Sequence, residues 1–458
     1  MLKHLRFCLL LLSVVFVFSC EEDNNQQEDK SEKEKLISNL NNELYPLAED
    51  PLKWEDDELN FLDPVAENSK IIGLGEATHG SSEFFNAKAR IFKYLVKKHG
   101  YKVFAFEADF GESVIINRDI QKGNAYYMKK VMEDNMLFWT WKTEEVRDLL
   151  EWMCEYNKGK PENEKVHYMG IDAQVNKNNP DLINNYLQEA NASFSSHADS
   201  ILSVAKTASD NDFSSYNPES FAKYINKLEA LKDSMENSKN KLVENSSEKK
   251  YELYKRILQV VKQTSKVRKF QDKYHLRDSC MAENSTWMLD YFDDEKVVVW
   301  AHNGHIIKGR RYEIDKMGKF INRELGDEYA AIGFSFSYGS FNAVEYVNGD
   351  YGNLKTHEIS SEPRKGSINS IFSEAKTNTF SVAISDLEYY SSWNTKFFEN
   401  TDILSIGAVY NSHPEDYYRV FNKKYFDHLI YFDEVSESEF IWNKKRGIAP
   451  RCNKKKRL

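Results

Sequence analysis

The chain of 458 residues is poor in proline, glycine and cysteine, and each shortage argues against a class of protein. Nine prolines and 19 glycines are too few for a collagen-like or linker-dominated chain. Five cysteines are too few for a disulfide scaffold. Positive charge is not in excess either: a net charge of −10 argues against a dedicated nucleic-acid binder. Because 41% of the residues are hydrophobic, the chain can build a large core.

The first twenty residues combine a positive start, a short apolar run and a cysteine. Lys3 and Arg6 precede the apolar stretch Phe7–Phe18, which is too short for a comfortable membrane span. The stretch leads through a serine to Cys20, an arrangement typical of a bacterial lipoprotein signal peptide. We therefore expect a signal peptide over 1–19, a lipid anchor on Cys20 and a place in the cell envelope. An ordinary secretory signal is the alternative.

Composition divides the rest of the chain into further segments. Residues 21–35 hold no apolar side chain, so we expect 20–35 to be a disordered tether. Apolar runs indicate an α/β core in two parts, 36–175 and 274–440. Between them, 176–273 has leucines and aromatics at helical spacing and is predicted to be a helical insertion or cap. The basic tail 441–458 is predicted to be a frayed end, with contact to anionic lipid or glycan phosphate as the alternative.

Eight short runs have the near-continuous apolar character of strands that are buried on both faces. They are Ile71–Leu74, Val103–Phe106, Val166–Ile171, Val297–Ala301, Ala330–Phe336, Phe380–Ile384, Ile403–Val409 and Leu429–Phe432. An apolar stripe followed by Gly100 predicts a helix over Ser82–His99. Because strands and helices alternate, the sequence predicts an α/β fold with a mostly parallel central sheet flanked by helices.

Acid and base side chains directly follow four of the predicted strands. They are Glu76 and His79 after the first run, Glu107 after the second, Asp172 after the third, and His302, Asn303 and His305 after the fourth. Because ligands bind beyond the carboxyl ends of parallel strands, we expect these residues to converge on one site. A neutral imidazole can take a proton from water, and a carboxylate on its other nitrogen fixes the tautomer. The pattern therefore favours hydrolysis, and no G-x-S-x-G elbow or P-loop is present.

Four segments together resemble the erythromycin esterase family, which includes succinoglycan-biosynthesis-like proteins. They are GEATHGSSEFFNAKARIFKYL from Gly75, the strand ending in Glu107, the segment Arg277–Asn284, and WAHNGHI from Trp300. The resemblance covers roughly residues 40–435. It implies an α/β core with added helices and the attack of water on an ester. In the best-known members that ester is a macrolide lactone.

The resemblance also implies roles for individual residues. His79 would be the general base, Glu76 or Glu107 would orient it, and His302 or His305 would polarise the carbonyl or protonate the leaving alcohol. Lys88 and Arg90 would pair with these carboxylates or with a substrate oxygen. The candidate substrate-binding residues are Lys88, Arg90, Asp172, Arg277 and Asn303. The expected substrate is a small-molecule ester, a macrolide or an acylated glycan, and no cofactor is expected.

Several alternatives remain open from the sequence. Glu76 and Glu107 could serve as structural ion-pair partners, and one histidine of the second motif could only support the other. Asp172 could cap the following helix. The two histidine motifs and the carboxylates could also form a mixed metal site. As whole functions, a cell-surface lipoprotein that binds a ligand or metal and a deacylase in exopolysaccharide modification stand beside the ester hydrolase.

Overall fold

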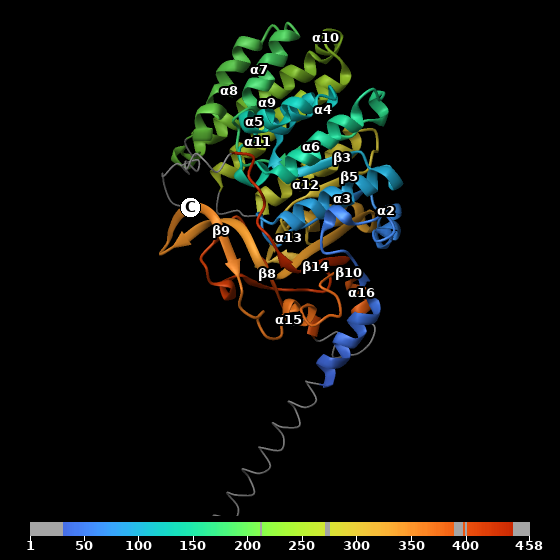
Figure 1. Ribbon diagram of the computed structural model, residues 1–458. Coiled ribbons are helices and arrows are strands. Elements are labelled where there is room, and N and C mark those ends of the chain that lie inside the picture. The colour runs from blue at the N-terminus through green and yellow to red at the C-terminus, as the bar shows by residue number, and fades with distance from the viewer. Residues whose placement is uncertain (1–30, 211–212, 271–274, 389–396, 399–400, 443–458) are drawn as a thin grey trace, which may run out of the picture.

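The computed structural model describes residues 31–210, 213–270, 275–388, 397–398 and 401–442 (Figure 1). The predicted signal peptide, Cys20 and nearly all of the basic tail lie outside these residues. Residues 31–43 are helical, and this helix buries Leu36 and Leu40 and pairs Lys33 with Glu374 at 2.5 Å. The structure therefore differs from the predicted tether over residues 31–35, because the polar residues there begin a helix whose next turns pack on the core.

A ten-stranded sheet forms the centre of the molecule, in the order β1-β10-β14-β8-β2-β5-β3-β4, with β9 and β12 also paired to β8. The six strands from β14 to β4 are all parallel to their neighbours, whereas β1, β10 and β9 form antiparallel pairs. The predicted α/β fold with a mostly parallel sheet is confirmed. The strands are β1 (Tyr45–Pro46), β2 (Ile71–Leu74), β3 (Val103–Asp109), β4 (His167–Asp172), β5 (Val297–Trp300), β8 (Tyr329–Val347), β9 (Asp350–Ile359), β10 (Thr379–Ala383), β12 (Val409–Tyr410) and β14 (His428–Val435).

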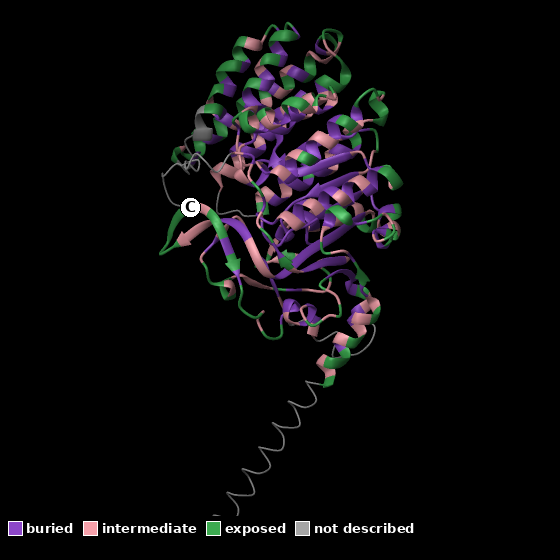
Figure 2. Ribbon diagram, in the orientation of Figure 1, coloured by how far each residue is buried: buried purple, intermediate pink, exposed green. Residues whose placement is uncertain are grey.

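The central strands are buried (purple in Figure 2) because they carry apolar side chains on both faces, whereas most of β9 is exposed. In β5, Val297 and Val299 join one hydrophobic cluster, while Val298 and Trp300 join the other. Helices cover the two faces. On one side lie α3 (Ser82–His99), α5 (Met128–Asn135) and α6 (Glu144–Asn157), and on the other α12 (His275–Tyr291) and α14 (Met317–Leu325). α4 (Phe110–Gln121) packs on the edge strand β4 and contributes to both clusters, with Phe110 and Val114 in one and Ile116 and Ile120 in the other.

Helices fill the segment predicted as an insertion, and they stand together at one end of the molecule (Figure 1). They are α7 (Asn179–Glu189), α8 (Ser195–Asp210), α9 (Pro218–Asn237), α10 (Lys239–Glu244) and α11 (Glu248–Lys269). The polar stretch between α10 and α11 contains Ser247, whose side chain accepts a hydrogen bond from the backbone of Lys250 and so caps α11. None of the helices in the described part of the chain is long and apolar enough to cross a membrane.

The prediction of one strand over Ile403–Val409 is wrong. The segment forms two short strands, β11 (Asp402–Leu404), which pairs with β13 (Tyr418–Val420), and β12. Between them the backbone of Ile406 donates a hydrogen bond to Ala77, so this stretch joins the loop after β2 instead of continuing a strand. The remaining short elements are α2 (Asp63–Asn68), α13 (Asn303–Ile306), α15 (Ile368–Phe372), α16 (Ile384–Glu388), β6 (Arg310–Arg311) and β7 (Ile314–Asp315).

Candidate active site

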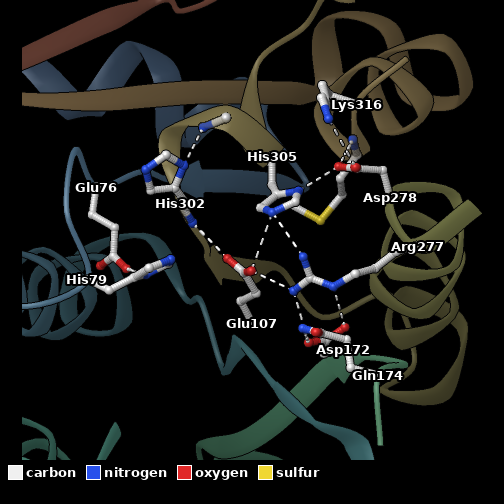
Figure 3. Close-up of polar contacts among 12 residues, drawn as sticks. Glu76, His79, Glu107, Asp172, Gln174, Arg277, Asp278, His302, His305 and Lys316 are labelled. Carbon is white, nitrogen blue, oxygen red and sulfur yellow. Dashed lines mark hydrogen bonds and ion pairs between the residues drawn. The ribbon is translucent and has the colours of Figure 1, made fainter. Parts of the chain in front are cut away.

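The four strands that the sequence associates with acid and base residues lie side by side in the order β2-β5-β3-β4. Because they are parallel, the loops after them meet at one edge of the sheet. Glu76, His79, Glu107, Asp172, His302 and His305 are gathered there, as Figure 3 shows. The expected convergence on one site is therefore seen.

Glu76 connects His79 to a buried lysine. One carboxylate oxygen, Oε1, lies 2.5 Å from His79 Nδ1. The other, Oε2, accepts hydrogen bonds from Trp300 Nε1 at 2.7 Å and from Lys88 Nζ, which lies 4.3 Å from the centre of the Trp300 ring. Glu76, Lys88 and Trp300 are buried, whereas the side chain of His79 keeps 14% of its surface exposed. Glu76 therefore orients the histidine, and Nε2 has no hydrogen-bond partner among the described residues.

Burial and charge act in opposite directions on this group. Burial alone would lower the pKa of His79, but the hydrogen bond and charge of Glu76 and the charge of Glu107 raise it above its usual value. Burial raises the pKa of Glu76, but Lys88 and His79 together outweigh this effect, so the pKa lies below its usual value. Burial lowers the pKa of Lys88 to about 8 against the attraction of Glu76. Glu76 is therefore ionised and His79 readily accepts a proton on Nε2.

Arg277, from α12, joins the ends of β3 and β4. Its Nε and Nη2 atoms donate to the two oxygens of Asp172, both at 2.9 Å, and Nη2 also donates to Glu107 Oε1 at 2.6 Å. Burial opposes the charge of Arg277, but the two carboxylates raise its pKa. Asp172 is thus an ion-pair partner of Arg277 and not only a turn residue; its Oδ1 also accepts from the backbone of Ala173. The structure thus brings Arg277 and Asp172 together beside Glu107, and the substrate-binding role expected for both stays a prediction.

His305 occupies the centre of the network in Figure 3. Its Nδ1 lies 2.7 Å from Asp278 Oδ1, while Nε2 lies 3.1 Å from Arg277 Nη1 and 3.4 Å from Glu107 Oε1. Asp278 is buried, and although burial raises its pKa, His305 and Lys316 lower it, so that it stays ionised. His305 therefore has its own orienting carboxylate, as His79 has.

His302 has a different environment, although it lies three residues from His305. Its Nδ1 accepts a hydrogen bond from the backbone of Gly304 at 3.0 Å and caps α13, and its Nε2 donates to the carbonyl of Ile406 at 3.0 Å. Burial lowers its pKa to about 3, helped by the positive charges of His79 and Arg311. Its backbone N–H donates to Glu107 at 2.9 Å. His302 is a neutral positioning residue, and the predicted proton-transfer role does not fit its contacts.

Two other predicted substrate-binding residues have structural partners instead. Arg90 lies two residues beyond Lys88 on α3 and points to another side, where it binds the carbonyl of Trp54 at 2.7 Å and Asp56 at 2.6 Å. Asn303 exchanges hydrogen bonds with the backbone of Phe334 in β8, at 2.6 and 3.1 Å. The structure thus removes Arg90 and Asn303 from the group that faces the site.

Sequence reasoning missed Asp278 and Trp300. Trp300 belongs to the WAHNGH motif, and its ring N–H, which needs an acceptor when buried, could have indicated the hydrogen bond to Glu76. Asp278 adjoins Arg277 in the quoted α12 segment, but its partner His305 lies 27 residues away. Among the described residues, no group of three or more His, Cys, Asp and Glu has the arrangement of a metal site. The contacts are those of oriented acid and base groups.

Comparisons with known proteins bear on the family and the fold. The family model described as erythromycin esterase matches residues 96–435, which include Glu107, Arg277, His302 and His305, whereas Glu76 and His79 lie before the matched range. A Bacillus subtilis protein, YbfO, provisionally named a hydrolase, is 25% identical over 421 residues, 84% of this chain and 88% of that protein. The Escherichia coli erythromycin esterase type II is 23% identical over 422 residues, 84% of this chain and 94% of that protein.

Solved structures share the fold. A Bacillus cereus protein is 24% identical, with a TM-score of 0.76 over 89% of this chain and 99% of that one. A structure described as a succinoglycan biosynthesis protein is 22% identical, with a TM-score of 0.75 over 89% and 99%. An erythromycin esterase mutant in its open conformation is 15% identical, with a TM-score of 0.66 over 88% and 99%. At these identities the likeness shows the fold alone.

Proposed function

Because the chain belongs to the erythromycin esterase family, we propose that it is a hydrolase that cleaves an ester or lactone with water activated by His79. One observation carries the proposal: Glu76 holds Nδ1 of His79 at 2.5 Å and leaves Nε2 on a partly exposed ring. A neutral imidazole in this position is a general base whose tautomer is fixed by a carboxylate. The buried Lys88 and Trp300 keep that carboxylate in place.

In the proposed reaction, His79 Nε2 takes a proton from water as the oxygen attacks the acyl carbon. The carbonyl oxygen becomes an oxyanion, and collapse of the tetrahedral intermediate breaks the bond to the alcohol. His305, held by Asp278 at Nδ1 and protonated on Nε2 toward Glu107 at 3.4 Å, gives a proton to that alcohol. In this state the 3.1 Å contact of Nε2 with Arg277 Nη1 opens, and the guanidinium supports the negative charge nearby. Ester and water are thus converted to acid and alcohol without a covalent enzyme intermediate.

The test is a hydrolysis screen of the purified protein against 14-membered macrolides, acylated sugars and both neutral and anionic aryl esters, read by mass spectrometry. A hydrolase adds the mass of one water to a lactone or releases an acid from an ester. General-base catalysis contributes about 10²–10⁴-fold. We therefore expect His79→Ala to lower the rate by about that factor.

The matched control is His99→Ala. His99 is the last residue of α3 and, like His79, pairs with a carboxylate, Asp63, at 2.7 Å, but it lies at the far end of that helix from the Glu76 group. Its rate should equal that of the wild type. Full activity in His79→Ala, or equal losses in both variants, would contradict the assigned base. Absence of turnover on the whole panel would count against an ester hydrolase.

We also propose that the protein is attached to the cell envelope through Cys20, on the sequence pattern before that residue. Metabolic labelling with a radioactive fatty acid should mark the wild type but not Cys20→Ser. Labelling of both forms, or of neither, would contradict this attachment.

A further inference from the structure

Next to the candidate site, two arginines lie close together without a carboxylate. Arg311 ends β6, and Arg419 is the middle residue of β13. A Cβ placed on Gly304 would lie 2.7 Å from Arg311 Nη1 and 3.2 Å from His302 Nδ1, so the guanidinium packs against the Gly304 backbone beside the His302 ring. The His302 ring in turn lies 5.1 Å from that of His79, centre to centre. Arg311 is thus within reach of a substrate bound at His79.

Neither guanidinium is neutralised by the described part of the protein. No Asp or Glu side chain there forms an ion pair with Arg311 or Arg419, and the Nε atom of each is buried without a hydrogen-bond partner. Arg419 uses Nη1 on the carbonyl oxygens of Asp416 at 2.5 Å and Tyr418 at 3.0 Å. By contrast, the adjacent Arg310 pairs with Asp315 at 2.6 Å. Arg311 and Arg419 thus lack a carboxylate partner among the described residues, although the chain has a net charge of −10 and therefore an excess of carboxylates.

The arrangement is unfavourable for the protein alone. Burial lowers the pKa of Arg311, and the positive charge of Arg419 lowers it further. The hairpin that carries Arg311 turns through Tyr312 and Glu313, whose φ angles are 52° and 60°. Residues other than glycine and asparagine rarely adopt this left-handed backbone conformation. Arg311 thus lies next to a tight turn, where the positive charge of Arg419 acts on it, and an anion bound to both would relieve the repulsion.

We propose that Arg311 and Arg419 form a subsite for an anionic group of the substrate, a carboxylate or a phosphate, so that the protein acts on anionic esters. The inference rests on the proposed hydrolase function. Guanidinium groups bind both kinds of oxyanion through paired, charge-assisted hydrogen bonds. The subsite lies beside His302, and the reacting ester bond then lies toward His79.

The first experiment measures binding without turnover. Full-length His79→Ala protein is titrated calorimetrically with phenylphosphonate, and with benzamide as a neutral aryl probe. We expect the affinity for phenylphosphonate to fall as the salt concentration increases. A second substitution, Arg311→Gln or Arg419→Gln, should lower that affinity by a further factor of about ten or more. Arg310→Gln, the neighbouring arginine that has a carboxylate partner, should leave binding unchanged. Equal phenylphosphonate affinity in all variants with intact thermal unfolding would overturn the subsite.

The second experiment measures selectivity with otherwise active protein. The kcat/KM for mono-4-nitrophenyl succinate should fall about tenfold or more in Arg311→Gln, while that for neutral 4-nitrophenyl butyrate stays within twofold. Equal losses for both esters would assign Arg311 to the reaction itself and overturn the subsite. If no ester is hydrolysed but phenylphosphonate binding still depends on Arg311, the hydrolase proposal fails and the anion subsite stands.

Discussion

Replacement of Arg277 by methionine tests whether this residue holds the site together. Arg277 is the shared partner of Glu107 and Asp172, whose side chains are 8% and 1% exposed. Removing one member of a buried, hydrogen-bonded ion pair costs about 3–5 kcal/mol, because the remaining charge is left buried. Methionine fills similar space but cannot bind either carboxylate. We expect a loss of this size from Arg277→Met at neutral pH.

The expected change in melting temperature follows from chain size. At about 2.1 cal/mol/K for each residue, 458 residues give an unfolding entropy near 1 kcal/mol/K. A loss of about 3–5 kcal/mol then lowers the midpoint by about 3–5 °C. Differential scanning calorimetry of the two proteins in the same buffer measures this difference directly.

The effect of Arg277→Met should also depend on pH. In the wild type, burial raises the pKa of Glu107, but His305, Arg277 and His79 lower it well below the usual 4.5. A lowered carboxyl pKa contributes stability that is present above the unfolded value and lost as pH falls through the folded one. Without Arg277 the pKa of Glu107 rises, so the variant loses this stability. The difference between variant and wild type should therefore be largest near pH 7 and shrink as the pH falls below 4.5.

The matched control is Arg147→Met. Arg147 lies on α6 and pairs with Glu144, with Asp148 at 2.8 Å and with Glu151 at 3.4 Å, and these carboxylates are 27%, 65% and 37% exposed, far more than Glu107 or Asp172. Exposed pairs contribute about 0–1 kcal/mol, so the midpoint should move by about 1 °C or less. A loss in Arg277→Met no larger than the control's, or one that does not shrink as the pH falls below 4.5, would refute the role of Arg277 as a buried counter-charge.

Two further predictions concern titration. Glu76→Gln removes the hydrogen-bonded charge that raises the pKa of His79, so burial and the charge of Lys88 should lower that pKa. The rising limb of the kcat/KM profile and the midpoint of the His79 ring signals in an NMR titration should then move to lower pH together, and no movement would contradict the pairing of Glu76 with His79. Burial, with the charge of Asp172, raises the pKa of Asp109 to about 7, so its contribution to stability is present below pH 3.8 and lost as pH rises through 7. Asp109→Asn, which can still cap α4, should raise the midpoint at pH 8 relative to pH 5, and an equal shift at both would contradict this.

Local sequence patterns predicted the elements that position the site. The bounds of β2 and α3 agree with the expected Ile71–Leu74 and Ser82–His99. Both depend on information within a few residues: an unbroken apolar run buried on both faces, and an apolar stripe that ends at Gly100, whose φ of 70° favours glycine. The strand expected over Ile403–Val409 failed because a distant hydrogen bond, from Ile406 to Ala77, breaks it.

The roles of individual side chains were harder to predict than their positions. Lys88 and Arg90 looked equivalent in the sequence, yet helix geometry turns one toward Glu76 and the other toward Asp56. His302 and His305 looked equivalent too. Their difference lies in partners far along the chain, the Ile406 carbonyl for His302 and the Asp278 carboxylate for His305. No short-range pattern contains such contacts.

The charges of the assembled site explain why two separate histidines suit the proposed reaction. The network holds three cations, Lys88, Arg277 and Lys316, and four carboxylates, Glu76, Glu107, Asp172 and Asp278. With both histidines neutral it carries one excess negative charge, and one proton on either His79 or His305 balances it. Glu107 acts on both, through its charge on His79 and at 3.4 Å from His305. When His79 takes a proton from water and His305 gives one to the alcohol, the proton changes place while the total charge stays constant.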